Sequence, residues 1–205
     1  MPTADEVNEA IDRFDRDCQP GEWLLRQLFH KYPRNTNLDH VFLKTIVLNK
    51  VYNAGVRAEN PVAKHIESLP GLDSLIEEGS DDAVNRIAHV KIAGREFCFL
   101  AFASKYCSWH NLAAYPIFDK NVRECLLFHK RKDGFAKFTL DSLYDYPSFR
   151  DVVNKFRRRY GLQFSYKDLD KFMWLCGGRL LDAKAAAKSS NRQATAGPPE
   201  EFRQP

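Results

Sequence analysis

The stretch from Ile92 to His129 reads IAGREFCFLAFASKYCSWHNLAAYPIFDKNVRECLLFH. Its nearly unbroken apolar run, Phe97–Ala103, predicts a buried helix that ends in the polar residues around Lys105. A loop then leads to Asp119, which opens a second helix from Lys120 to about His129. The sequence therefore predicts a lysine at the polar end of a buried helix and an acid at the start of the next helix.

Length and composition predict a globular chain. It has 205 residues, of which 44% are hydrophobic and 13% aromatic, enough for one domain or at most two small ones. No run of 18 apolar residues is present, so we expect no membrane span. The N-terminus is acidic and polar, unlike a secretory signal. The net charge of +4 is mild, so where the charges lie matters more than their sum.

The five cysteines give no sign of a disulfide framework. They stand at positions 18, 98, 107, 125 and 176, and no two of them are separated by only two residues. This spacing predicts neither an iron–sulfur cluster nor a zinc site, so we expect no metal and no cofactor. Reduced cysteines fit a cytoplasmic (nucleoid-associated) or nuclear protein.

Helical periodicity continues on both sides of the central stretch. Helices are predicted over residues 4–18, 20–32, 39–53, 61–69, 81–88, 147–161 and 166–178. We find no convincing β-strand alternation. From about Ala183 the composition turns to Ala, Lys, Ser, Gln and Pro, which predicts disorder. We expect a single all-α domain over residues 1–182 and a disordered tail over 183–205.

Asp119 has two interpretations. An aspartate just before a helix is usually an N-cap, whose carboxylate accepts bonds from the first free amides. The same geometry fixes a carboxylate that can stabilise a developing cation or orient a nucleophilic water. A sugar carbon that becomes an oxocarbenium ion is such a cation.

Lys105 also has two interpretations. A lysine in the last turn of a helix interacts favourably with the helix dipole and extends to water. The apolar run before it suggests instead a partly desolvated amine, whose pKa is lowered and which can act as a nucleophile.

An aromatic and polar group follows Lys105 at the helix end. It consists of Tyr106, Trp109, His110 and Asn111. Such residues can stack on a flipped base and hydrogen-bond its edge. Trp109 can equally belong to the core, with His110 and Asn111 ending the helix.

Basic residues cluster close to Asp119. They are Lys120, Arg123, Lys130, Arg131 and Lys132, and a second cluster at residues 155–159 lies on a later helix. Either cluster can be an ordinary solvated face. Two clusters near one candidate site favour contact with a phosphate backbone.

The order of these features resembles the helix–hairpin–helix DNA glycosylase superfamily, especially its 8-oxoguanine-glycosylase-like branch. The resemblance spans roughly Asp39–Leu127, with a glycine-led helix, Gly94–Tyr106, before the acid-opened helix. It implies that Asp119 is the essential acid and that Lys105 is the nearest match to the lysine that attacks C1′ in bifunctional members. At the family's hairpin position the chain has Ile92-Ala93-Gly94-Arg95-Glu96, with a single glycine.

We therefore predict a monomeric DNA glycosylase that acts on double-stranded DNA, flips a damaged or modified base and cleaves its N-glycosidic bond, with or without a lyase step. The sequence does not specify the target base, which can belong to a repair substrate or to modified foreign (phage) DNA. The same residues are also consistent with a non-catalytic helical DNA-binding protein, and with a helical interaction module that binds no nucleic acid.

Overall fold

Helices make up nearly all of the regular structure, so the predicted all-α fold is confirmed. The computed structural model describes residues 1–195, with the backbone alone for residues 18–20 and 190–195. The elements are α1 (Ala4–Lys31), α2 (Leu38–Tyr52), α3 (Glu59–Ser68), α4 (Leu72–Glu77), α5 (Asp81–Ala88), β1 (His89–Ile92), β2 (Arg95–Cys98), α6 (Leu100–His110), α7 (Lys120–Asp133), the 3₁₀ helix η1 (Asp141–Tyr144), α8 (Tyr146–Tyr160) and α9 (Tyr166–Thr195).

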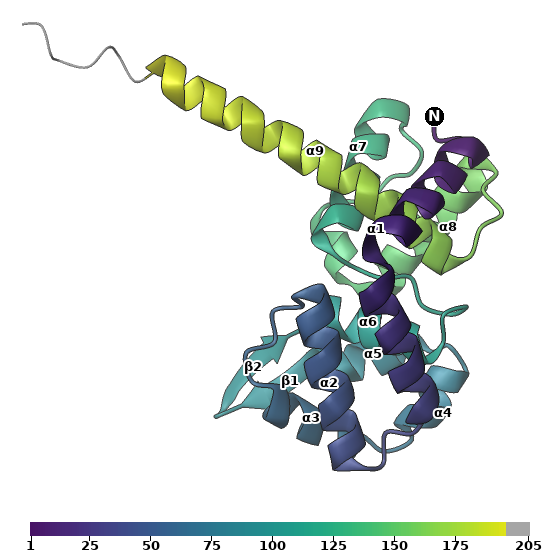
Figure 1. Ribbon diagram of the computed structural model, residues 1–205, viewed down its shortest axis with the longest axis vertical. Coiled ribbons are helices and arrows are strands. Elements are labelled where there is room, and N and C mark those ends of the chain that lie inside the picture. The colour runs from purple at the N-terminus through teal and green to yellow at the C-terminus, as the bar shows by residue number, and fades with distance from the viewer. Residues whose placement is uncertain (196–205) are drawn as a thin grey trace, which may run out of the picture.

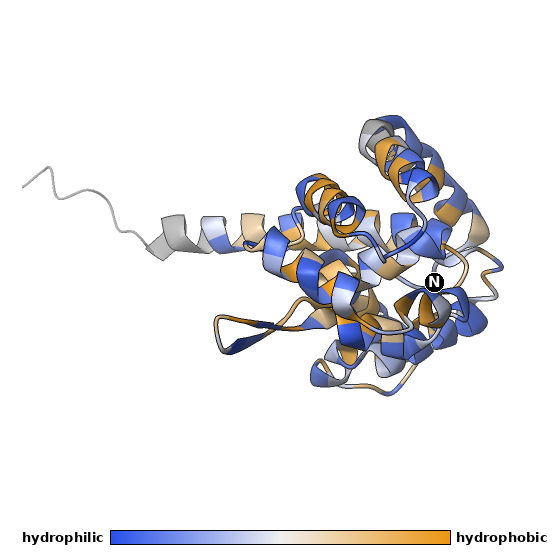
Figure 2. Ribbon diagram, turned by 90° about the horizontal axis from the view of Figure 1, so that it is seen from below, coloured by the Kyte–Doolittle hydropathy of each residue, from blue (hydrophilic) through white to orange (hydrophobic). Residues whose placement is uncertain are grey.

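The elements form two neighbouring groups joined by α1. Figure 1 shows α2 to α6 and the two strands in one group, and α7, α8 and the start of α9 in the other. The long helix α1 packs against α2 and α6 and also against α9. Most helical ribbons in Figure 2 carry hydrophobic residues along one side and hydrophilic residues along the other. One connected cluster of buried hydrophobic side chains extends from Val7 to Met173 across both groups.

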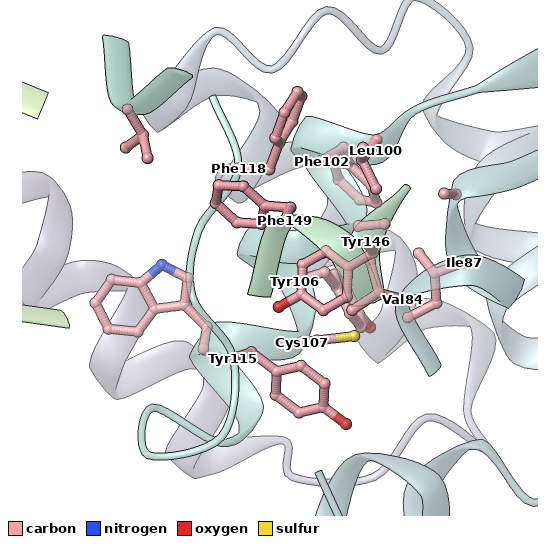
Figure 3. Close-up of a cluster of buried hydrophobic side chains, with 14 of the residues drawn as sticks. Val84, Ile87, Leu100, Phe102, Tyr106, Cys107, Tyr115, Phe118, Tyr146 and Phe149 are labelled. Atoms are coloured by element: carbon pink, nitrogen blue, oxygen red, sulfur yellow. The ribbon is translucent and has the colours of Figure 1, made fainter. Parts of the chain in front are cut away.

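The apolar face of α6 lies at the centre of this core. Figure 3 shows its residues Phe102 and Tyr106 among side chains from α5, α8 and the loop before α7. Phe118 and Phe149 meet edge to face, with ring centroids 5.2 Å apart. The Tyr146 hydroxyl, fully buried, donates to the Pro116 carbonyl at 2.9 Å. These contacts fix the loop that leads to Asp119.

The first helix does not break at Pro20, contrary to the prediction of two helices. α1 continues from Ala4 to Lys31. A proline inside a helix costs about 3 kcal/mol. Burying one leucine or phenylalanine side chain contributes about 1.5–3 kcal/mol, and α1 buries Val7, Leu25 and Phe29 among others. Packing on both sides of the proline therefore outweighs its cost.

The predicted glycine-led helix at Gly94 is wrong, because the chain forms a β-hairpin there. β1 and β2 pair antiparallel, with Ile92 opposite Arg95. Ala93 and Gly94 make the turn with φ values of 49° and 79°. Two central residues of positive φ match the twist of a two-residue hairpin. α6 therefore begins only at Leu100, and the residues at the family's hairpin position connect two strands.

The predicted start of disorder at residue 183 is also wrong for the described part of the tail. α9 continues to Thr195, and Lys184 pairs with Glu124 of α7 at 2.5 Å. Alanine and lysine are strong helix formers, and extending an already packed helix needs no new nucleation. Residues 196–205 of the predicted tail lie outside the described residues.

Candidate functional site

Lys105 and Asp119 lie against each other. The Lys105 Nζ is 3.7 Å from the Asp119 Oδ2, and the two side chains are 5% and 14% exposed. The other carboxylate oxygen of Asp119 accepts a bond from the Val122 N–H at 2.8 Å. Asp119 is therefore an N-cap through one oxygen and the partner of a buried lysine through the other.

Ser104 holds the loop before Asp119 onto α6. Its Oγ accepts a bond from the Phe118 N–H at 3.0 Å and donates to the Ala101 carbonyl at 3.2 Å. Ser104 immediately precedes Lys105, and Phe118 immediately precedes Asp119. The bond between Ser104 and Phe118 thus sets the approach of the lysine and the acid.

A second acid, Asp170 on α9, joins the pair. Its side chain is 8% exposed, and its Oδ1 has no hydrogen-bond partner among the described residues. Burial raises the pKa of Asp170 to about 7; Lys167 opposes the rise, and the negative charge of Asp119 adds to it. Asp170 was not predicted from the sequence. Its position three residues before the apolar Met173 places both on one helix face, and this spacing is the sequence signal that could have indicated a buried acid.

Tyr52, on α2, links the pair to α1 and α9. The Lys105 Nζ lies 5.3 Å from the centre of the Tyr52 ring. The Tyr52 hydroxyl accepts bonds from the Trp109 Nε1 at 3.1 Å and from the Lys167 Nζ at 3.3 Å, and it donates to Glu22 at 3.2 Å. Burial, followed by the charge of Glu22, raises the pKa of Tyr52 well above its usual range.

These contacts define one cluster, which we call the Lys105 cluster. Its members are Glu22, Tyr52, Lys105, Trp109, Asp119, Lys167 and Asp170. Two lysines face three carboxyl groups there, so a protonated Asp170 leaves the cluster without net charge. Burial is the largest cause of the raised pKa of Asp170, because the two lysines lower this pKa while Asp119 and Glu22 raise it.

The buried acid predicts a pH dependence of folding. The folded pKa of about 7 lies above the ordinary 3.8, so the free energy of unfolding should fall as pH rises through this window. The loss is up to about 4 kcal/mol, from about 1.36 kcal/mol per pKa unit. Asp170→Asn should remove this fall, which urea unfolding of both proteins at pH 5 and 8 would measure. Parallel pH curves for the two proteins would contradict the prediction.

Of the four predicted base-contacting residues, only Trp109 belongs to the Lys105 cluster. It lies four residues after Lys105 and so shares its helix face. Tyr106 and His110 point to another polar group around Lys44 of α2. The Tyr106 hydroxyl donates to Asn35 Oδ1 at 2.6 Å, and the His110 Nε2 is 3.2 Å from the Lys44 Nζ.

Lys44 is a buried structural lysine that was not predicted from the sequence. Its Nζ donates to the carbonyls of Tyr32 and Arg34 and to the side chain of Asn35, at 2.7–3.1 Å. Burial lowers the pKa of Lys44 to about 7, while Asp73 acts in the opposite direction. Burial, with Lys44 beside it, lowers the pKa of His110 well below its usual range. His110 is therefore neutral and can accept from Lys44.

The prediction that Asn111 contacts a base does not match its position. Its Nδ2 donates to the carbonyls of Ile76 and Glu77, at 3.1 and 3.2 Å. These carbonyls belong to the last turn of α4, where the Ile76 carbonyl also accepts from the Gly79 N–H at 3.1 Å. Asn111 therefore hydrogen-bonds the backbone carbonyls at the C-terminal end of α4.

A pocket of about 320 Å³ opens beside Trp109 and His110. It is lined by both of these residues together with Arg26, Phe29, Asp73 and Glu77. Trp109 thus borders the pocket and also bonds into the Lys105 cluster. The volume and the mixture of aromatic and polar side chains suit a small planar ligand.

The five predicted backbone-contacting residues fall into two sets. Arg123 donates to the Tyr144 hydroxyl and Lys130 to the Phe138 carbonyl, so both are engaged within the chain. Lys120, Arg131 and Lys132 are exposed on α7. The helix that Asp119 opens therefore carries three exposed cations.

These observations define a mostly helical protein of the all-α class with a buried lysine–carboxylate cluster, to which α1, α2, α6, α9 and the start of α7 contribute. A family model described as the N-terminal domain HI_0787_N matches residues 6–115, and the chain belongs to this family. The match includes Lys105 and ends before Asp119.

An uncharacterized protein of Haemophilus influenzae is 36% identical over 145 residues, which cover 68% of this chain and 70% of that protein. No solved structure matches. Among the described residues, no helix combines the length and the apolar character needed to cross a membrane.

Proposed function

We propose that this chain is a DNA glycosylase that cleaves the N-glycosidic bond of a damaged or modified base. The observation that carries the proposal is the buried contact of 3.7 Å between Lys105 and Asp119, beside a second acid whose pKa is about 7. Breaking an N-glycosidic bond leaves positive charge on the sugar. A fixed carboxylate in a poorly solvated site stabilises such charge strongly.

Asp119 is the group that stabilises the sugar cation. The Val122 N–H and the Lys105 ammonium hold its two oxygens in place, so little reorganisation accompanies the reaction. Lys105 is either the amine that attacks C1′ or a donor to the base. The first role gives a covalent Schiff base and strand cleavage, whereas the second leaves an abasic site.

Asp170 is the group that accepts a proton from the nucleophile, whether water or Lys105. Its pKa of about 7 suits a general base at neutral pH. Its Oδ1 has no partner among the described residues and is available to a substrate proton. Glu22, Tyr52, Lys105 and Asp119 surround it from neighbouring elements, and Lys167 lies three residues before it on α9.

Trp109 and the pocket beside it are the proposed place for the flipped base. An indole offers a face on which a base can stack, and flipping exposes the sugar to attack. Moving the base there requires local opening, because Lys105 and Asp119 are largely buried.

The exposed cations of α7 should contact DNA phosphates. Replacing Lys120, Arg131 and Lys132 together with serine should weaken binding and flatten its salt dependence, because each lost phosphate contact lowers the slope by about 0.9. Fluorescence anisotropy with a labelled duplex at several salt concentrations measures the slope. The control is Lys64→Ser, an exposed residue of α3. No DNA binding by the unaltered chain at low salt would favour the interaction module.

The direct test of the proposal uses labelled duplexes that carry different modified bases, including modified phage DNA. Half of each sample is treated with hot alkali, which cleaves abasic sites, and borohydride trapping is run in parallel. We expect alkali-dependent cleavage of at least one duplex. A trapped complex that Lys105→Ala abolishes would make Lys105 the nucleophile. Salt-sensitive binding without cleavage of any duplex would favour the non-catalytic DNA-binding protein.

A further inference from the structure

Two cysteines and a histidine meet between α7 and α9. Cys125 and His129 lie four residues apart on one face of α7, and Cys176 lies on α9. One ligand atom from each of the three side chains lies within 4.8 Å of the other two. Cys125 and His129 are buried and Cys176 is half-buried. None of the three contributes to the Lys105 cluster.

The His129 ring is held in one orientation. Its Nδ1 is 3.4 Å from the Asp133 Oδ2, which also accepts a bond from the Tyr160 hydroxyl at 2.9 Å. Phe156 and Tyr160 pack edge to face against the ring. The contact with Asp133 assigns the ring proton to Nδ1 and leaves the Nε2 lone pair for a ligand. A carboxylate behind a histidine is the usual support of a metal-binding imidazole.

Close packing of the two helices brings the thiols together. A Cβ at Gly177 would lie 1.9 Å from the Asn121 carbonyl oxygen, so α9 touches the backbone of α7 there. Gly177 is the neighbour of Cys176, and Asn121 lies one turn before Cys125. The absent side chain at Gly177 thus sets the distance between the two cysteines.

We propose that Cys125, His129 and Cys176 bind a zinc ion as three protein ligands. Two thiolates and an imidazole form a donor set that zinc prefers over harder cations. With Zn–S near 2.3 Å and Zn–N near 2.0 Å, a tetrahedral ion spaces its ligand atoms about 3.5–3.8 Å apart. Since the three atoms lie within 4.8 Å of one another, they need to approach by at most about 1 Å, which side-chain rotation supplies.

The fourth coordination position faces a cavity of about 700 Å³ between α1, α7 and α9. His129 and Cys176 line it, together with Arg13, Arg16, Phe128 and Arg179. A zinc with three protein ligands keeps a water in the fourth position. The site therefore takes water or a small ligand. The cavity lining is of mixed charge, because Glu6, Glu9 and Asp12 line it as well as Arg13, Arg16, Lys132 and Arg179.

The expectation of no zinc site came from the absence of closely spaced cysteine pairs. Here one helical turn supplies a cysteine and a histidine, and a distant helix supplies the second cysteine. The zinc site does not depend on the proposed glycosylase function, because it uses no residue of that site.

The test measures zinc in the untagged full chain, reduced, loaded with ZnCl₂ and dialysed. Native mass spectrometry should find one zinc per chain, and competition with a chromophoric chelator gives its affinity. Asp133→Asn should weaken binding about 10- to 100-fold, and Cys176→Ser and His129→Gln should weaken it more. Cys98→Ser, at an exposed cysteine outside the cluster, should bind as the unaltered chain does.

Cobalt substitution checks the ligands themselves. The cobalt-loaded chain should show thiolate-to-metal charge-transfer absorption, which Cys176→Ser reduces while circular dichroism confirms that the variant is folded. Zinc well below one per chain, or equal zinc affinity in Cys176→Ser and the unaltered chain, would overturn the inference. So would a stable disulfide between Cys125 and Cys176 in the protein isolated without reductant.

Discussion

Asp119→Asn should slow base excision about 100- to 1,000-fold, the range measured when a single preorganised electrostatic group is removed. Asparagine retains an oxygen that can accept the Val122 N–H, so the start of α7 should be preserved. The substitution removes the negative charge that lies beside Lys105 and that would stabilise the cationic sugar. DNA binding should stay the same or tighten, because one negative charge near the phosphates disappears.

Single-turnover cleavage with enzyme in excess measures this effect, and anisotropy measures binding separately. The matched control is Asp145→Asn, because Asp145 caps α8 through the Ser148 N–H at 3.0 Å and is exposed. The control should cleave at the normal rate. Equal cleavage by Asp119→Asn and Asp145→Asn would mean that Asp119 is only a helix cap, and its proposed catalytic role would fail.

Gly177→Ala should destabilise the fold by at least the upper end of the range of about 1–3 kcal/mol that is typical of overpacking. The new Cβ would lie 1.9 Å from the carbonyl oxygen of Asn121. Both partners belong to helices, so the clash is relieved only by moving α9 away from α7. The same movement separates Cys125 from Cys176 and shifts Asp170.

Gly178→Ala is the matched control for this substitution. A Cβ there meets only the Asn121 Nδ2, at 3.4 Å. Alanine is favoured over glycine inside a helix by about 1 kcal/mol, so this variant should be neutral or more stable. Urea unfolding midpoints of Gly177→Ala and Gly178→Ala measure the difference in stability between the two variants. Equal midpoints would show that the close approach of α7 and α9 contributes little to stability.

The sequence by itself determined the helical class and the local position of several site residues. The apolar run that becomes α6 predicted a buried helix, although its start was placed too early. The pattern before Lys120 predicted that Asp119 opens α7. The spacing of four residues predicted that Lys105 and Trp109 share a helix face. These features depend on neighbouring residues, which sequence periodicity reports directly.

Tertiary structure decided which polar side chains meet. The helical pattern shows which face of α9 is apolar, but not that Asp170 would lie near Asp119 and Lys105 or that Cys176 would lie near Cys125. The helical pattern also placed Tyr106 and His110 on the same helix as Lys105. In the structure both side chains turn to Lys44 instead, because adjacent helical residues point about 100° apart. Local preference was also outweighed at two other places. Packing keeps α1 continuous through Pro20, and extension of an already packed helix carries α9 past residue 183. A contact between distant segments depends on how whole helices pack, and no local pattern encodes that geometry.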